Sequence, residues 1–161
     1  MKHPIGKRLL SAAEFVRQGA YFADIGTDHA YLPLFLLEGG KIERAVCSDI
    51  NAGPLETAKR NAEEYGLSDR IIFRLTSGAE GLSDMGITDY AICGMGGELI
   101  AEIIESAPHL KDGAVRLIHG KGTGALKNAL WQRLKHDRRV ASFRIAAYGE
   151  GDGGVTVVEL K

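Results

Sequence analysis

Apolar and polar residues fall into short blocks along this chain, and their spacing alternates between that of helices and that of strands. Residues 7–18 repeat apolar side chains at helical spacing, which predicts an amphipathic helix that ends at Gly19. A second helix is expected to open near Pro33, because proline suits a first helical turn. The other predicted helices are 54–65, one that contains residues 99–104, and 125–135. The predicted strands are 21–24, 44–49, 70–75, 90–93, 114–119, 141–148 and 155–160.

The order of these elements predicts an α/β fold. Strands that alternate with helices favour an open, mostly parallel sheet of seven strands with helices on both faces. Residues 149–154 are too short for a helical crossover, so the last two strands should form a C-terminal antiparallel hairpin. No linker divides the chain. We therefore expect a single domain, residues 1–161, with an N-terminal helix in 1–19 and a core in 20–161. The sequence does not fix the oligomeric state, and a monomer is favoured.

The composition adds limits on the class of protein. The chain has 161 residues, 45% of them hydrophobic, a net charge of −1 and 21 glycines. No apolar stretch is long enough to span a membrane, and the charged N-terminus does not resemble a secretory signal. Cys47 and Cys93 lie in apolar segments and form no disulfide framework. We expect a globular protein of the reducing cytoplasm.

Charge is unevenly distributed along the chain. Residues 81–110 carry five acidic side chains and no Lys or Arg, whereas residues 111–144 carry nine basic and two acidic side chains. Such a basic block fits a phosphate-rich partner, and a solvated helix face explains it equally well. Lys127, Trp131 and Lys135 share one helix stripe, which is either an RNA-facing strip or a tryptophan covering the sheet edge.

The first predicted strand ends in Asp24-Ile-Gly26, followed by Thr27 and Asp28. A glycine at this point allows a ligand to approach the backbone, and the helix that follows offers free N–H groups. The dinucleotide pattern G-x-G-x-x-G is absent, since Asp28 and Ala30 stand where glycines would be needed. The acids would repel a pyrophosphate and suit a cationic ligand instead.

Three later strand ends carry further candidates. Asp49 is suited to accept both hydroxyls of a ribose, or else to a turn or helix cap. Ser77 and Gly78 offer backbone N–H groups to a purine edge, or form an ordinary turn. The run 94–97, Gly-Met-Gly-Gly, fits a wall that a transferring methyl group approaches closely. An acid-lined glycine turn with a ribose acid points to S-adenosylmethionine. The predicted cofactor contacts are Asp24, Gly26, Thr27, Asp28, Asp49, Ile50, Ser77, Gly78 and Gly94.

Several of these segments together resemble the bacterial tRNA (adenine(22)-N1)-methyltransferases. The segments are Lys7-Arg8-Leu9, Gln18-Gly19-Ala20, the run 24–33 (D-I-G-T-D-H-A-Y-L-P), Gly53-Pro54 and the run 94–97 (G-M-G-G). The resemblance implies a class I methyltransferase fold, which is Rossmann-like, with S-adenosylmethionine as donor and N1 of a tRNA adenine as acceptor. It also implies that Asp24, Gly26 and Asp49 contact the cofactor.

The sequence differs from that family at three places. Family members usually continue into a C-terminal helical domain thought to help hold tRNA, whereas this chain stops at Lys161. Their fifth strand usually ends in L-Q-P-N, where residues 117–121 here read L-I-H-G-K. Residues 48–51, S-D-I-N, replace a G-E-V-V-like run but keep an acid. The first two differences concern acceptor binding, and the third leaves the cofactor site intact.

The predicted catalytic residues are Asp28, Gly94 and Met95, which by the resemblance border the methyl pocket. Methylation at N1 makes adenine cationic, so the Asp28 carboxylate is a candidate to stabilise that charge, with capping of the next helix as its alternative. His29 is a pocket neighbour or a structural histidine, and Tyr31 stacks on a flipped base or belongs to the core. We expect no metal, because no ligand spacing supports one.

tRNA is the expected partner. The basic residues predicted to contact it include Lys7, Arg8, Lys121, Lys127 and Lys135. Three other functions stay open: a methyltransferase for another RNA or a small molecule, a module that binds cofactor without tRNA activity, and, least favoured, a nicotinamide-dependent oxidoreductase.

Overall fold

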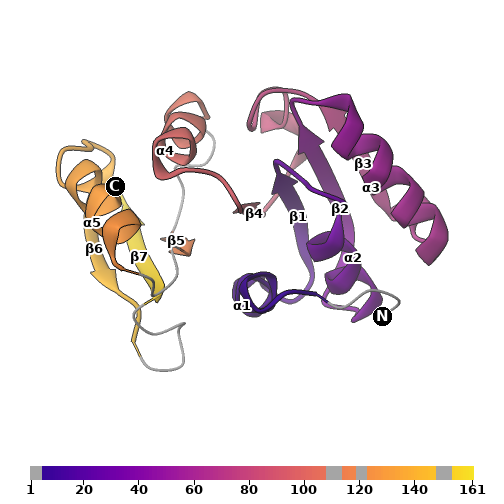
Figure 1. Ribbon diagram of the computed structural model, residues 1–161, viewed down its shortest axis with the longest axis horizontal. Helices are drawn as coiled ribbons and strands as arrows, with labels where there is room; N and C mark the ends of the chain where they lie inside the picture. Colours follow the sequence, from indigo (N-terminus) through magenta and orange to yellow (C-terminus); the bar gives the residue numbers. More distant parts are fainter. Residues whose placement is uncertain (1–4, 108–113, 119–122, 148–153) are drawn as a thin grey trace. The chain divides into compact units, whose positions relative to one another are not determined.

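The computed structural model describes residues 5–107, 114–118, 123–147 and 154–161 (Figure 1). The chain divides into two compact units, Met1–Met95 and Gly96–Lys161. Each unit is described by itself below. The expectation of one domain over residues 1–161 stays a prediction.

The first unit is built on four parallel strands in the order β3-β2-β1-β4. The strands are β1 (Ala20–Ile25), β2 (Ile42–Asp49), β3 (Ile71–Leu75) and β4 (Asp89–Ile92). The helices are α1 (Lys7–Phe15), α2 (Tyr31–Glu38) and α3 (Ala52–Tyr65), with short 3-10 turns at Ser68–Arg70 and Ser83–Met85. All six residues of β1 are buried, so this strand is the centre of the core.

Two helices of the first unit connect neighbouring strands and pack against them. α2 contacts β1 and β2, α3 contacts β2 and β3, and the two helices contact each other. The apolar residues of α2 are almost continuous, and four of its leucines are buried: Leu32, Leu34, Leu36 and Leu37. α3 is amphipathic and ends at Gly66, whose left-handed backbone donates an N–H to the carbonyls of Ala62 and Glu63. The sequence-based boundaries of α3 are therefore close to those observed.

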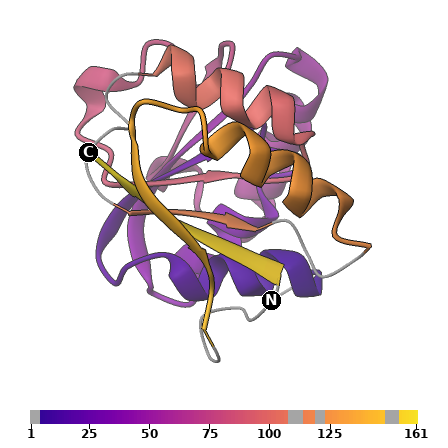
Figure 2. The same cartoon turned by 90° about the vertical axis from the view of Figure 1, so that its left-hand side faces the viewer.

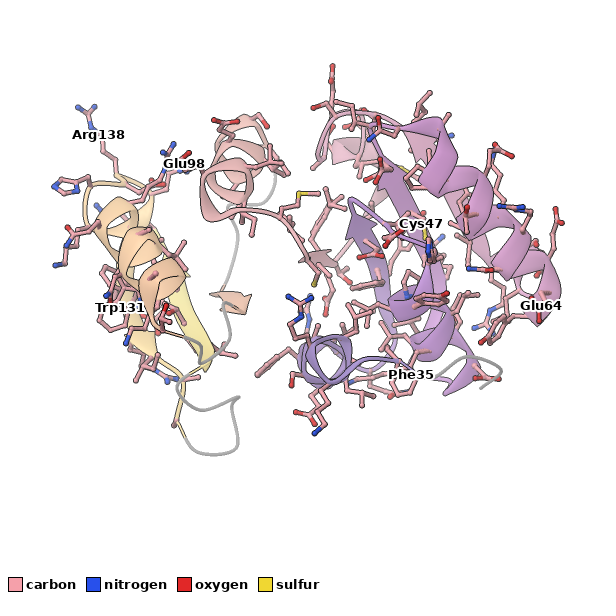
Figure 3. The ribbon with its side chains drawn as sticks, in the orientation of Figure 1. Phe35, Cys47, Glu64, Glu98, Trp131 and Arg138 are labelled. Atoms are coloured by element: carbon pink, nitrogen blue, oxygen red, sulfur yellow. The ribbon has the colours of Figure 1, made fainter. Side chains whose placement is uncertain are left out.

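The second unit contains a three-stranded antiparallel sheet in the order β5-β7-β6. Its strands are β5 (Ala114–Ile118), β6 (Val140–Ile145) and β7 (Val155–Leu160), and its helices are α4 (Gly97–Ser106) and α5 (Ala125–Leu134). α4 and α5 lie side by side in Figure 2 and contact each other. Trp131 of α5 (labelled in Figure 3) donates its indole N–H to Thr156 Oγ1 of β7 over 2.8 Å. This bond and the buried valines of β7, Val155, Val157 and Val158, make the core of this unit.

The structure confirms the alternation of strands and helices, the parallel arrangement in the first unit and the C-terminal antiparallel hairpin. The prediction of one seven-stranded sheet is wrong, because the seven strands are divided between a sheet of four and a sheet of three. β5 forms its ladder with β7, and β4, only four residues long, forms its ladder with β1. The class of fold is α/β as predicted.

Some boundaries also differ from expectation. The first helix ends at Phe15 rather than near Gly19, because Val16 is already extended. Gly19 instead has a positive φ of 74° and donates its N–H to the Lys41 carbonyl. Residue 119 of the predicted fifth strand and residue 148 of the sixth lie outside the described residues. No helix in the described ranges is long and apolar enough to cross a membrane.

Candidate functional site

The carboxyl ends of the four parallel strands form one edge of the first sheet. In the strand register, Ile25 of β1 lies opposite Ser48 of β2 and Ile92 of β4, and Asp49 of β2 lies opposite Leu75 of β3. Every predicted cofactor and catalytic residue ends one of these strands or follows it. The set is Asp24, Gly26, Thr27, Asp28, Asp49, Ile50, Ser77, Gly78, Gly94 and Met95. Open α/β sheets bind ligands at this edge.

The turn after β1 is bonded to the end of β2. The backbone N–H groups of Gly26 and Thr27 both donate to the Ser48 carbonyl, each over 2.8 Å. The Thr27 hydroxyl, fully buried, donates to Asp24 Oδ2 over 2.7 Å. Gly26 has a φ of 72°, a conformation that glycine adopts without strain. These hydrogen bonds fix Asp24 and the glycine turn relative to each other. The sequence pattern did not identify Ser48, whose carbonyl accepts two of the bonds.

Asp24 is a buried acid with an unusual pKa. Burial raises the pKa of its carboxyl to about 6, the hydrogen bond from Thr27 opposes this rise, and the nearby charges of Asp28 and Asp49 add to it. The three acids thus act on one another at this edge. A cation bound there would relieve their repulsion, which agrees with the cationic ligand expected from the sequence.

Asp49 ends β2 and stabilises the turn that follows it. Its Oδ1 accepts the Asn51 N–H over 2.7 Å, and its carbonyl accepts the Thr76 N–H over 3.0 Å. The turn role considered from the sequence is therefore present, and it holds the carboxylate in one orientation at the sheet edge. The next residue, Ile50, is 68% exposed, an uncommon setting for a large apolar side chain.

The segment after β3 lies beside the end of β2. Ser48 Oγ donates to the Gly78 carbonyl over 3.3 Å, and Gly78 has a φ of 56°, while Ser77 is exposed. Leu75, the last residue of β3, is 63% exposed and was not identified from the sequence. Because Leu75 belongs to an apolar strand, the sequence pattern predicts that its side chain is buried. The strand register instead places Leu75 at the edge of the sheet, opposite Asp49.

Met95 joins the end of β4 to the turn after β1. A methyl group added at Gly26 would collide with Cε of Met95, so the methionine side chain lies directly against this glycine. Gly94, which precedes it, has a φ of 77°. The prediction that residues 94–95 and the Gly26 turn border one site is consistent with this contact.

Asp28 is the most exposed acid of the turn, with 79% of its side chain accessible. Its Oδ1 lies 2.8 Å from His29 Nδ1, and the His29 ring meets the Tyr31 ring edge to face at 5.3 Å. The alternative role of Asp28, capping α2, is not what the structure contains: the cap position is Ala30, and no side chain bonds the helix end. Tyr31 is the first residue of α2 and half-buried.

The basic residues predicted to contact RNA are spread over both units. Lys7 and Arg8 are exposed at the start of α1. In the second unit, Lys127 Nζ lies 5.7 Å from the centre of the Trp131 ring, and Lys135 is exposed at the end of α5. Lys121 lies outside the described residues. Because Trp131 is bonded to buried Thr156, its structural interpretation is supported, and the lysines stay predictions.

Across the residues that the structure describes, no three His, Cys, Asp or Glu side chains are grouped so that they could hold a metal ion. Both cysteines are free thiols: Cys47 is buried in β2 opposite Asp24 (Figure 3), and Cys93 is half-buried. Burial raises the pKa of the Cys93 thiol to about 11, so it is protonated at neutral pH.

Comparisons with known proteins identify the class of protein to which this chain belongs. The model of a methyltransferase domain family matches residues 5–132. A candidate tRNA (m1A22) methyltransferase of Streptococcus pneumoniae, solved in complex with S-adenosyl-L-methionine, is 33% identical with a TM-score of 0.76; the match covers 98% of this chain and 73% of that one. The tRNA (adenine(22)-N(1))-methyltransferase of Bacillus subtilis is 40% identical over 114 residues, 71% of this chain. The chain belongs to this methyltransferase family, in its bacterial tRNA (adenine(22)-N1)-methyltransferase branch. It spans about half the length of the Bacillus relative, 48% of that protein.

A second similarity is to a different class of protein. A stretch of 64 residues, 40% of this chain, is 50% identical to endonuclease MutS2 of Ruminiclostridium cellulolyticum. The match covers 8% of that protein, so the similarity concerns a short segment of it.

Proposed function

We propose that this chain is an S-adenosylmethionine-dependent methyltransferase that acts in the cytoplasm, as a monomer, on N1 of an adenine in tRNA. Family membership supports the reaction class. The observation that carries the proposal is the sheet edge itself. It gathers three acids around a turn, with glycines of positive φ at the ends of β1, β3 and β4.

The residues at this edge fit S-adenosylmethionine. The relative from Streptococcus was solved with this molecule, which supplies an electrophilic methyl group on a cationic sulfonium. The carboxylate of Asp24 complements a cation, and that of Asp49, oriented by Asn51, suits a ribose diol. Exposed Ile50 offers an apolar surface for the adenine.

The methyl acceptor would meet the exposed part of the turn. N1-methyladenine carries a positive charge at neutral pH, so a carboxylate next to the acceptor lowers the free energy of the charged product and of the transition state that leads to it. Asp28 is the exposed carboxylate here, and its Oδ1 lies 2.8 Å from His29 Nδ1. Gly94 and Met95 border the same turn and complete the predicted catalytic set. Alignment of donor and acceptor is the main demand of an in-line methyl transfer.

The test is transfer of labelled methyl from S-adenosylmethionine to unmodified bacterial tRNA, with nucleoside mass spectrometry of the product. We expect N1-methyladenosine with the wild type and none with Asp28→Ala, which should still bind cofactor. Methyl incorporation into another RNA or a small molecule, and not into tRNA, would show that tRNA is not the substrate. Cofactor binding without incorporation into any acceptor would leave a module that binds the cofactor without catalysis.

We further infer that the MutS2-like stretch lies in the second unit and binds nucleic acid. The stretch is 64 residues long, close to the length of the unit Gly96–Lys161. This unit contains the whole basic block, residues 111–144, which includes the exposed residues Lys135 and Arg138, the latter labelled in Figure 3. Phosphate contacts would make the affinity for nucleic acid fall steeply with salt.

This second role has its own test. Binding of tRNA and of duplex DNA is measured over a range of salt concentrations, for the wild type and for Lys127→Gln with Lys135→Gln. We expect the double variant to bind more weakly with a flatter salt slope. Thr123→Ala, outside the basic residues, is the control. Salt-independent binding would contradict the proposal, and a preference for DNA would separate this unit's role from tRNA methylation.

A further inference from the structure

The turn between β1 and α2 contains two consecutive residues, neither of them glycine, with left-handed backbone. The φ angles of His29 and Ala30 are 69° and 59°. L-residues avoid this region because the Cβ crowds the neighbouring carbonyl. Two in succession persist only when surrounding contacts hold them. The contacts on either side of this turn therefore decide the backbone conformation that precedes α2.

The first half of the turn is held by β2. The N–H groups of Gly26 and Thr27 donate to the Ser48 carbonyl, and the Thr27 hydroxyl bonds Asp24. These bonds lie on the β1 side of Asp28. The left-handed residues lie on the other side of it, toward α2.

The second half of the turn is held by α3. Asn61 Nδ2 donates to the His29 carbonyl over 2.8 Å, from a residue 32 positions along the chain. α3 is a firm support for this bond, because Ala58 and Ala62, which flank Asn61 on the helix, are fully buried. Directly after the turn, the Leu34 N–H donates to the Ala30 carbonyl over 3.0 Å and α2 begins.

We propose that Asn61 is a positioning residue for the cofactor site. By bonding the His29 carbonyl it keeps residues 29–30 left-handed, which starts α2 at Tyr31 and presents Asp28 between two anchored halves of the turn. Asn61 acts through the turn and not by touching a ligand. The inference rests on the proposed function, because it takes this turn to be part of the cofactor site.

The test compares Asn61→Leu, which keeps the side-chain size but removes the donor, with Arg60→Ala. Arg60 is the preceding residue on α3, is exposed, and bonds Thr57 within the same helix. We expect Asn61→Leu to weaken binding of S-adenosylhomocysteine about five- to tenfold, the change that an ordinary lost hydrogen bond produces. In the ligand-free protein, amide hydrogens of residues 28–34 should exchange faster. Arg60→Ala should change neither quantity.

A rescue variant separates positioning from support of the fold. Ala30→Gly removes the Cβ that makes the left-handed conformation costly, so adding it to Asn61→Leu should recover part of the affinity. Unchanged affinity and exchange in Asn61→Leu, with or without a lower Tm, would overturn the proposal. If the wild type binds no S-adenosylhomocysteine, the proposed function fails instead, and the exchange of residues 28–34 still decides whether Asn61 holds the turn.

Discussion

At the scale of single residues, the site combines groups that a stable fold would avoid. Asp24 is a buried acid, and Gly26 and Gly94 adopt conformations that other residues resist. Strain and buried charge concentrate where a ligand can compensate for them. Replacing a residue proposed to bind the cofactor should therefore change the free energy of unfolding and the affinity for the cofactor in different ways.

Asp24→Asn should stabilise the ligand-free protein at neutral pH. Because the pKa of Asp24 in the folded protein, about 6, lies above the ordinary aspartate value of 3.8, the stability that this group contributes is fully present below pH 4 and is lost as pH rises through 6. The amide removes that loss, and its oxygen can still accept the Thr27 hydroxyl. We expect a gain of up to about 3 kcal/mol at pH 7 that disappears near pH 4.

Urea unfolding of wild type and Asp24→Asn between pH 4 and pH 8 measures this difference. A gain of the same size at every pH would show that the Asp24 carboxyl does not titrate in this range. The same variant should bind S-adenosylmethionine more weakly, since it lacks the negative charge.

Gly26→Ala and Gly94→Ala form a matched pair. Both glycines have φ near 75°, with 72° at Gly26 and 77° at Gly94, so both substitutions should cost about 1–2 kcal/mol of backbone strain. At Gly94 the added methyl meets nothing within 4 Å, whereas at Gly26 it meets Met95 Cε. Because Cε is the free end of a flexible side chain and can move aside, Gly26→Ala should cost only slightly more than Gly94→Ala in thermal unfolding. Adding Met95→Ala should remove that small excess, and a much larger cost at Gly26 that persists with Met95→Ala would contradict this account.

At the scale of elements, long-range bonds connect segments that are distant in the sequence. Arg17, just after α1, donates through its backbone N–H and through Nε to the two carboxylate oxygens of Asp89 at the start of β4, each over 2.8 Å. This bond pair raises the pKa of the Arg17 guanidinium. It holds α1 to the strand that leads into Gly94 and Met95.

Asp89→Ala should lower the free energy of unfolding by about 1 kcal/mol, because it removes the acceptor of the Arg17 backbone N–H, while the mostly exposed guanidinium keeps its bond to the Thr88 carbonyl and is solvated by water. Glu56→Ala, which breaks the exposed pair with Lys59 on α3, is the control and should cost about 0.5 kcal/mol or less. Denaturant unfolding gives both values. Equal effects would mean that the Arg17–Asp89 pair behaves as an ordinary surface ion pair.

Much of the element order was predictable from the sequence, because hydrophobic spacing is a local property. The strand ends at Asp24, Asp49 and Gly94 were predictable for the same reason, and parallel strands bring such ends to one edge. The division into two sheets depends on which distant strands pair, which no local pattern contains. The left-handed backbone of His29 and Ala30 could not be predicted, because neither residue is a glycine. The roles of Asn61 and Ser48 could not be predicted either, because each depends on a hydrogen bond to a residue distant in the sequence.

At the scale of the whole molecule, the chain is similar to two different classes of protein. Its methyltransferase similarity extends over most of its length, and a stretch of 64 residues is also similar to a MutS2 endonuclease. The predicted cofactor and catalytic residues all lie in Met1–Met95, whereas the whole basic block, residues 111–144, lies in Gly96–Lys161. We therefore propose that the first unit binds the cofactor and that the second helps to hold nucleic acid.

The most direct measurement of the central claim is calorimetric titration of the full chain with S-adenosylmethionine and, separately, with NAD. The sheet edge, with its acids and no pyrophosphate-binding glycine pattern, predicts one S-adenosylmethionine bound per chain, weakened at least about tenfold in Asp49→Ala, and no binding of NAD. NAD binding without S-adenosylmethionine binding, or affinity unaffected by Asp49→Ala, would contradict the account.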